Sequence, residues 1–156
     1  MAVSMNAGQH ASSRQRKQVG CDTERASSHE STVPSSRPFK ILAVDDSAIS
    51  RKLVDQSLSG EGCALMFAKN SREALDVFAK HQPALVIKDW NMSDMEGPEL
   101  CKRIRRDFPD RYSYLILLTS NSGKDKIVEG LRAGADDYLT KPFHSDGDLP
   151  RAASFL

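Results

Sequence analysis

Short apolar segments alternate with stretches of helical periodicity from residue 39 onward, and this alternation restricts the chain to few folds. The apolar segments are nearly continuous, which is typical of strands buried on both faces of a parallel sheet. The stretches between them supply amphipathic helices that cover those faces. The pattern therefore predicts an α/β, doubly wound parallel sheet with strands at residues 39–44, 64–68, 85–89, 114–119 and 137–140.

The predicted helices carry recognisable start and stop signals. Asn70 and Glu73 form a capping-box pattern, and Pro98 suits the first position of a helix because its missing N–H costs little there. Gly134 is typical of the position just past a helix C-terminus. Apolar residues recur at helical spacing in each stretch: Ile49, Leu53, Val54 and Leu58; Ala74, Leu75 and Phe78; Leu100, Cys101 and Ile104; Ile127, Val128 and Leu131.

Five polar residues stand at the ends of four predicted strands: Asp45, Asp46, Asp89, Thr119 and Lys141. The carboxyl ends of parallel strands meet at one edge of a sheet, so we expect these side chains to converge. Carboxylate oxygens suit Mg²⁺, and an aspartate can act as a nucleophile toward phosphorus. A lysine and a threonine hydroxyl supply donors for phosphoryl oxygens. Each residue alone has an ordinary structural explanation, but together they predict a divalent-cation and phosphoryl site.

With these residues in place, the chain resembles the receiver domain of two-component response regulators, including the single-domain chemotaxis type. The resemblance covers about two-thirds of the chain. It implies a flavodoxin-like fold, in which the strands of the sheet have the order 2-1-3-4-5. The motifs that carry it lie at residues 41–47, 88–97, 117–120 and 134–143.

The resemblance assigns a phosphoacceptor and a metal site. Asp89 is expected to accept a phosphoryl group from a histidine kinase or phosphotransfer protein. Mg²⁺ is expected to bind Asp46 directly, Asp45 through water, Asp89, and the backbone carbonyl of Asn91.

The resemblance also implies how the phosphoryl group is sensed. Thr119 and Tyr138 are expected to form a switch pair, and Lys141 to contact the phosphoryl oxygens. Small Ser120 is expected to leave room for the group to enter. A protein of this kind modifies itself and is not a conventional enzyme; its downstream protein target is not encoded in these motifs.

Three positions depart from the family pattern. Ser93 stands where proline is usual, which predicts a looser loop with no ligand lost. Lys88 stands where an apolar residue is common, and we expect its stem to lie along the sheet with the ammonium in solvent. Residues 144–156 contain Gly147 and Pro150 and little periodicity, so the fifth helix that the family implies is predicted to be broken or truncated.

Composition places the receiver segment within the chain. Residues 1–37 are rich in Ser, Arg and Gln without periodicity, which predicts a disordered tail before a receiver domain at 38–143 and an irregular segment at 144–156. No apolar run approaches the roughly 18 residues of a membrane span, and the first residues lack the apolar core of a signal peptide. Three widely spaced cysteines indicate reduced thiols. We therefore expect a cytoplasmic protein without membrane contact.

Other functions remain to be weighed against a phosphorylation switch. The fold also suits a protein-binding module that works without phosphorylation, and the sequence pattern after residue 146 fits a truncated receiver of a longer regulator. The basic residues at 102–106 are accompanied by acidic neighbours, and the net charge is +1. That balance favours a solvated helical face, so no nucleic-acid partner is expected for this domain. The 89–100 segment has Asp94 and Leu100 at its sixth and twelfth positions, where a calcium-binding EF-hand loop needs glycine and glutamate.

Overall fold

Five strands and four helices alternate along the residues that the computed structural model describes, which are 38–59, 62–121 and 123–143. The strands are β1 (Phe39–Val44), β2 (Cys63–Ala68), β3 (Leu85–Asp89), β4 (Tyr114–Thr119) and β5 (Asp137–Thr140). The helices are α1 (Ala48–Leu58), α2 (Ser71–His81), α3 (Gly97–Asp107) and α4 (Lys124–Arg132). The predicted strands are confirmed, with β2 beginning one residue earlier than expected.

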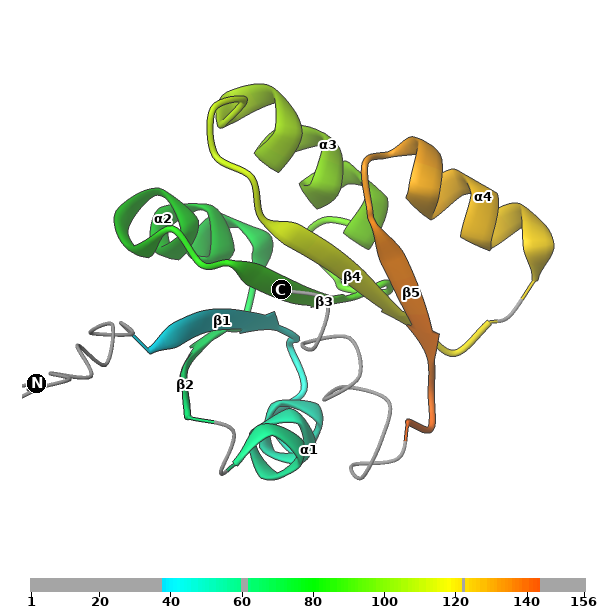
Figure 1. Cartoon of the computed structure of the whole chain (residues 1–156). Coiled ribbons are helices and arrows are strands. Elements are labelled where there is room, and N and C mark those ends of the chain that lie inside the picture. Colours follow the sequence, from blue (N-terminus) through cyan, green and yellow to red (C-terminus); the bar gives the residue numbers. More distant parts are fainter. Residues whose placement is uncertain (1–37, 60–61, 122, 144–156) are drawn as a thin grey trace, which may run out of the picture. The chain divides into compact units, whose positions relative to one another are not determined.

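The strands form one parallel sheet in the order β2-β1-β3-β4-β5 (Figure 1). This is the predicted doubly wound topology. Across the sheet, Val44 pairs with Lys88 and Asp89 pairs with Leu118. The register therefore brings the end of β1 level with the end of β3, which is where the predicted site residues begin.

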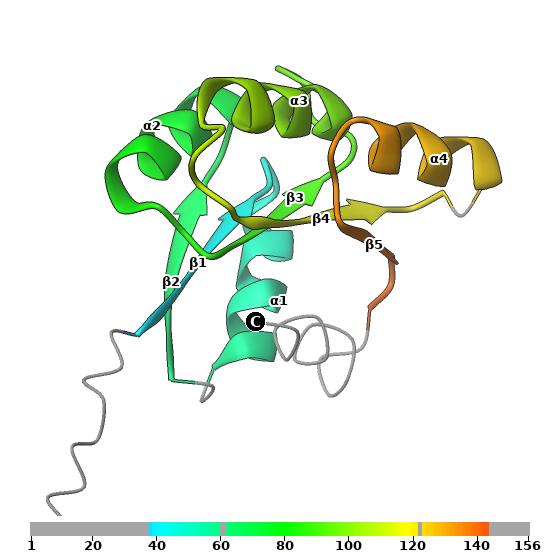
Figure 2. The ribbon, with the colours of Figure 1, turned by 45° about the horizontal axis from the view of Figure 1, so that its top comes forward.

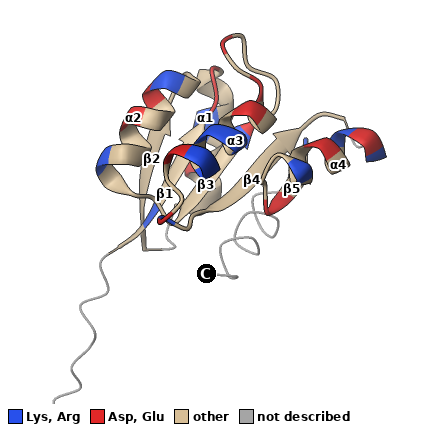
Figure 3. Cartoon of the chain, turned by 90° about the horizontal axis from the view of Figure 1, so that it is seen from above, with Lys and Arg blue, Asp and Glu red and all other residues tan. Residues whose placement is uncertain are grey.

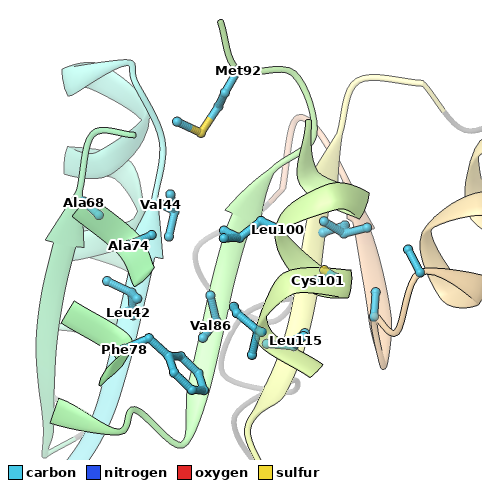
Figure 4. Packing of buried hydrophobic residues seen from close by; sticks show 14 of the residues in the cluster. Leu42, Val44, Ala68, Ala74, Phe78, Val86, Met92, Leu100, Cys101 and Leu115 are labelled. Atoms are coloured by element: carbon cyan, nitrogen blue, oxygen red, sulfur yellow. The ribbon is translucent and has the colours of Figure 1, made fainter. Parts of the chain in front are cut away.

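The helices cover both faces of this sheet. Figures 1 and 2 show α1 on one face and α2, α3 and α4 on the other. Alternate residues of each strand point to opposite faces, so the buried apolar residues divide into two clusters. The α1 cluster consists of Ile41, Ala43, Val54, Leu58, Leu85, Ile87, Ile116 and Leu118. The larger cluster under α2 and α3 includes Leu42, Val44, Ala74, Phe78, Val86, Leu100, Cys101, Ile104, Leu115 and Leu117, many of them drawn in Figure 4.

Local hydrogen bonds explain where the helices begin and end. Asn70 Oδ1 accepts from the Glu73 backbone N–H at 2.8 Å, so the predicted cap of α2 is present. Glu73 Oε2 accepts from the backbone N–H of Lys69 at 3.0 Å, one residue before the usual capping-box donor. After α4 the chain turns at Gly134, whose φ of 101° is strained for residues with a side chain.

Some of the apolar residues at helical spacing in α1 and α4 are exposed and do not belong to the core. In α1, Val54 and Leu58 are buried, but Ile49 is 75% exposed and Leu53 is 50% exposed. In α4, Val128 and Leu131 are also largely exposed. The helices themselves are confirmed. The predicted N-terminal tail, the irregular C-terminal segment and the broken fifth helix lie outside the described residues.

Candidate functional site

Three of the predicted site residues meet at the carboxyl edge of the sheet. Asp45 directly follows β1, Asp89 is the last residue of β3, and Lys141 directly follows β5. Lys141 Nζ lies 2.6 Å from Asp89 Oδ1 and 3.5 Å from Asp45 Oδ2. Both aspartates are buried, at 4% and 7% exposed, so one ammonium balances two carboxylates that water screens poorly.

The backbone around Asp45 is held from several sides. Its N–H donates to the Ala68 carbonyl at 3.1 Å, and its carbonyl accepts from Arg51 Nη1 at 2.6 Å. One carboxylate oxygen, Oδ1, accepts from the Ser47 backbone N–H at 2.8 Å. The other, Oδ2, is buried and has no hydrogen-bond partner. A buried carboxylate oxygen without a donor is costly, and a cation would satisfy it.

The remaining predicted metal ligands are less closely assembled. Asp46 is exposed and takes part in none of the ion pairs among the described residues. Asn91 is also exposed, in the loop between β3 and α3. Within the described ranges, no three His, Cys, Asp or Glu side chains form a group close enough to hold a metal ion. The structure thus brings together the carboxylates of Asp45 and Asp89 and the ammonium of Lys141. Asp46 follows Asp45 in the sequence but forms no ion pair with this group.

The donor chemistry nevertheless fits a hard divalent cation. Asp45 Oδ2, which has no hydrogen bond, and the carboxylate of Asp89 both form ion pairs with the Lys141 ammonium, so this position already favours positive charge. Hard oxygen ligands of this type are those that Mg²⁺ prefers. A small cation that displaced the ammonium would meet two of the four predicted ligands without rearrangement of the strands.

Among the described residues, no side-chain hydrogen bond joins the predicted switch residues Thr119 and Tyr138 to each other or to the carboxylates. The Thr119 hydroxyl donates to the Asn121 carbonyl at 3.1 Å and accepts from the Asn121 N–H at 3.0 Å. Tyr138 is half-buried and packs against the cluster under α2 and α3. The backbone of Thr119 contacts the site, because its carbonyl accepts from the Lys141 N–H at 2.8 Å. The threonine hydroxyl is therefore committed to its own loop in this conformation.

The prediction for Lys88 was wrong. Its side chain is 1% exposed, and its ammonium lies 2.7 Å from Met92 Sδ and 3.1 Å from the Met95 carbonyl oxygen, to which it donates. Burial lowers the pKa of Lys88, although the charges of Asp94 and Asp89 oppose that shift. The sequence held a signal for this burial: Lys88 continues an apolar run in the central strand, where both faces of the sheet are covered.

Trp90, the residue after Asp89, lies in the core beside the site. It is 2% exposed, and its backbone N–H donates to the Leu118 carbonyl at 2.7 Å. Lys126 of α4 places its ammonium 5.2 Å from the ring centroid. A Cβ on Gly130 would lie 3.0 Å from the indole ring, so α4 and the tryptophan are in close contact. The residue next to Asp89 is therefore packed directly against α4.

Charges of both signs are mixed over the helices on this side of the sheet. Figure 3 shows Lys and Arg beside Asp and Glu along α2, α3 and α4. Exposed pairs such as Lys126 with Glu129 contribute to this balance. In this view the basic residues of α2, α3 and α4 therefore have acidic neighbours. None of the described helices has the length and apolar character needed to cross a membrane.

Comparison with known proteins gives a consistent match. Residues 41–152 match the family model described as the response regulator receiver domain. The response regulator MprA of Mycolicibacterium vanbaalenii is 38% identical over 119 residues, which is 76% of this chain and 51% of that protein. A chemotaxis protein CheY homologue of Campylobacter jejuni is 35% identical over 107 residues, covering 67% of this chain and 82% of the homologue.

Solved structures agree with the sequence relatives. The chemotaxis response regulator CheY4 of Vibrio cholerae superposes with a TM-score of 0.71 at 32% identity, covering 77% of this chain and 100% of that one. A DrrB receiver domain activated with BeF3 gives a TM-score of 0.67 at 30% identity, over 76% of this chain and 97% of its own. The chain spans about half the length of the MprA relatives that it matches.

Proposed function

This chain belongs to the response regulator receiver domain family, and we propose that it is a phosphorylation-controlled switch that accepts a phosphoryl group on Asp89. The observation that carries the proposal is the meeting of Asp45, Asp89 and Lys141 at the carboxyl edge of the sheet. Two buried carboxylates that share one ammonium are poised to exchange that cation for a metal and a phosphoryl group.

Mg²⁺ is the proposed cofactor, held by Asp45, Asp46, Asp89 and the backbone carbonyl of Asn91. Two observations support this set of ligands: Asp45 Oδ2 accepts no hydrogen bond, and Asp45 and Asp89 both pair with the same ammonium. When bound, the metal neutralises the carboxylates and polarises an incoming phosphoryl group. Asp46 is exposed, so its side chain is free to turn toward the site without breaking an ion pair of the described residues.

Asp89 would act as the nucleophile. A carboxylate oxygen forms a bond to phosphorus, and the bond from phosphorus to the donor breaks, leaving a neutral imidazole after protonation if the donor is a phosphohistidine. Lys141, now 2.6 Å from Asp89, would then contact the phosphoryl oxygens. The chain receives and later loses the group itself, so it is not an enzyme acting on a separate substrate.

The response would depend on Thr119 and Tyr138. A phosphoryl group on Asp89 offers the Thr119 hydroxyl a charged acceptor, which is stronger than the Asn121 carbonyl it now contacts. Movement of Thr119 would change the space available to the half-buried Tyr138 ring. The proposed partners are a histidine kinase or phosphotransfer protein and a downstream protein target, in the cytoplasm, with residues 38–143 as the receiver domain.

The proposal is tested by incubating the protein with Mg²⁺ and acetyl phosphate and measuring intact mass. We expect one added phosphoryl group on the wild type, none in excess EDTA, and none on Asp89→Asn. Asp110→Asn, which changes an exposed loop aspartate, is the matched control and should be labelled like the wild type.

Two outcomes would contradict the proposal. Labelling of Asp89→Asn to the wild-type level would show that another residue is the acceptor. No labelling of the wild type by acetyl phosphate or by any histidine phosphodonor, with Mg²⁺ present, would favour the protein-binding module that works without phosphorylation.

A further inference from the structure

A lysine lies on the far side of the strand from the proposed phosphoacceptor. Lys88 and Asp89 are consecutive in β3, so their side chains point to opposite faces of the sheet. Val86, two residues before Lys88, belongs to the cluster under α2 and α3, and so does Met92, which Lys88 contacts. The ammonium is therefore inside the protein on the α3 side, beneath the loop that follows β3.

The ammonium of Lys88 makes few contacts that could offset the free-energy cost of burying its charge. Lys88 Nζ has one carbonyl acceptor, Met95 O at 3.1 Å, and one thioether, Met92 Sδ at 2.7 Å. None of the ion pairs among the described residues includes it. A methionine of similar length would avoid the desolvation cost of the charge, so this lysine is a weak contributor to stability.

Both contacts of Lys88 lie in the loop of residues 90–96, which carries Asn91. The ends of this loop are joined by a hydrogen bond, because the Gly97 N–H donates to the Trp90 carbonyl at 2.9 Å. Gly97 also packs so tightly that a Cβ there would lie 2.6 Å from Leu117. Between these ends, Asp94 accepts from the Ser71 N–H at the start of α2. Lys88 supplies the link from the loop to the strand that bears Asp89.

We propose that Lys88 is a positioning residue, whose buried ammonium holds the 90–96 loop against β3 so that the Asn91 carbonyl faces the metal site. The inference rests on the proposed function, since it concerns the same site. Ser93 lacks the ring that would stiffen this loop, and the bonds from Lys88 restrict the loop on both sides of Ser93. Positioning partners behind a metal ligand typically change metal affinity by about 10–100-fold.

The test compares Lys88→Met with Lys40→Met. Lys40 is the matched control, because its ammonium also donates to a backbone carbonyl, His81 O at 3.2 Å, but from the first residues of β1 at the other end of the sheet. In Lys88→Met the Mg²⁺ concentration for half-maximal labelling by acetyl phosphate should rise about tenfold. The maximal rate at saturating Mg²⁺ should change less than about twofold, since Asp89 and Lys141 remain. Lys40→Met should change neither quantity.

A second readout does not depend on the metal. Amide hydrogen exchange at Gly97 reports opening of the loop, because that N–H closes it on Trp90. Exchange at Gly97 should be faster in metal-free Lys88→Met than in the wild type or Lys40→Met, while the urea midpoint stays equal or rises. Met92→Leu, which leaves the ammonium in place and removes one contact, should shift both readouts in the same direction by a smaller amount.

The outcomes separate this inference from the proposed function. If Lys88→Met binds Mg²⁺ as tightly as the wild type or more tightly, the lysine acts only through its charge and the positioning role is overturned. Unchanged exchange at Gly97 overturns it as well. If the wild type binds no Mg²⁺, the proposed function fails, and the Gly97 exchange alone decides whether Lys88 holds the loop.

Discussion

The two ends of the sheet treat aspartates in opposite ways. At the amino end of the strands, Asp136 is bonded through both oxygens. Its Oδ2 accepts from Arg105 Nη2 at 2.7 Å and from the Leu115 N–H at 2.8 Å, and its Oδ1 accepts from the Tyr112 hydroxyl at 3.1 Å. Arg105 in turn donates to the carbonyls of Gly134 and Ser113. In this polar cluster both carboxylate oxygens of Asp136 have hydrogen-bond partners.

At the carboxyl end the aspartates are more deeply buried and less satisfied. Asp45 Oδ2 has no hydrogen bond, and Asp89 and Asp45 share the single ammonium of Lys141. The same residue type therefore serves two purposes in one sheet. The full hydrogen bonding of Asp136 is typical of a residue that stabilises the fold, and the deficit of donors at Asp45 supports the proposed site for a cation and a phosphoryl group.

The largest stability effect should come from the saturated end. Asp136→Ala removes three hydrogen bonds, one of them to a charged arginine, so unfolding free energy should fall by about 2–3 kcal/mol. Urea denaturation measures this, with Asp110→Ala as an exposed control that should change stability by less than about 0.5 kcal/mol. Phosphoryl labelling of folded Asp136→Ala should remain at the wild-type level. A small stability loss together with lost labelling would break the proposed division between the two ends.

At the carboxyl end we expect a smaller loss of stability, which depends on the Mg²⁺ concentration. Lys141→Ala leaves two neighbouring buried carboxylates without their ammonium, so stability in metal-free buffer should fall by about 1 kcal/mol. If Mg²⁺ displaces the ammonium as proposed, the ion should bind Lys141→Ala more tightly than the wild type and should therefore narrow the stability gap between them. A concentration ten times the dissociation constant adds about 1.4 kcal/mol to the stability of the protein that binds it. Arg106→Ala, which removes an exposed ion pair with Asp107 on α3, is the control and should show a gap that does not depend on Mg²⁺. A gap that is the same at every Mg²⁺ concentration would contradict a shared cation site.

The smallest effect sharpens the description of the amino end. Tyr112 is 71% exposed, so its bond to Asp136 competes with water. Tyr112→Phe keeps the ring over Arg105 and should lower stability by only about 0.5 kcal/mol. A loss comparable to that of Asp136→Ala would mean that the tyrosine hydroxyl, and not the Arg105 pair, holds this cluster together.

The sequence was sufficient for the fold because its signals are local and agree with one another. Near-continuous apolar runs located the five strands, and caps and breakers such as Asn70 and Gly134 located helix ends within a residue or two. The parallel arrangement then required Asp45, Asp89 and Lys141 to share an edge, and they do. Order of the strands came from the family resemblance and not from the periodicity.

The sequence did not determine where individual polar side chains would find partners. Lys88 was expected in solvent because lysine stems commonly extend, but a covered central strand left it only the Met95 carbonyl and the Met92 sulfur. The Thr119 hydroxyl bonds to Asn121, two residues away, because a local backbone partner competes with the more distant site. Choices of this kind depend on loop geometry, which residue spacing does not specify.

Calorimetric titration with Mg²⁺ tests the contrast between the two ends most directly. The wild type should bind one Mg²⁺. Asp45→Asn replaces the carboxylate whose Oδ2 lacks a hydrogen bond with a neutral amide, and it should lower the affinity for Mg²⁺ about tenfold or more. Asp136→Asn, at the saturated end, should bind like the wild type. Equal affinity in Asp45→Asn and the wild type, or no binding by the wild type, would contradict a cation site at the carboxyl edge of the sheet.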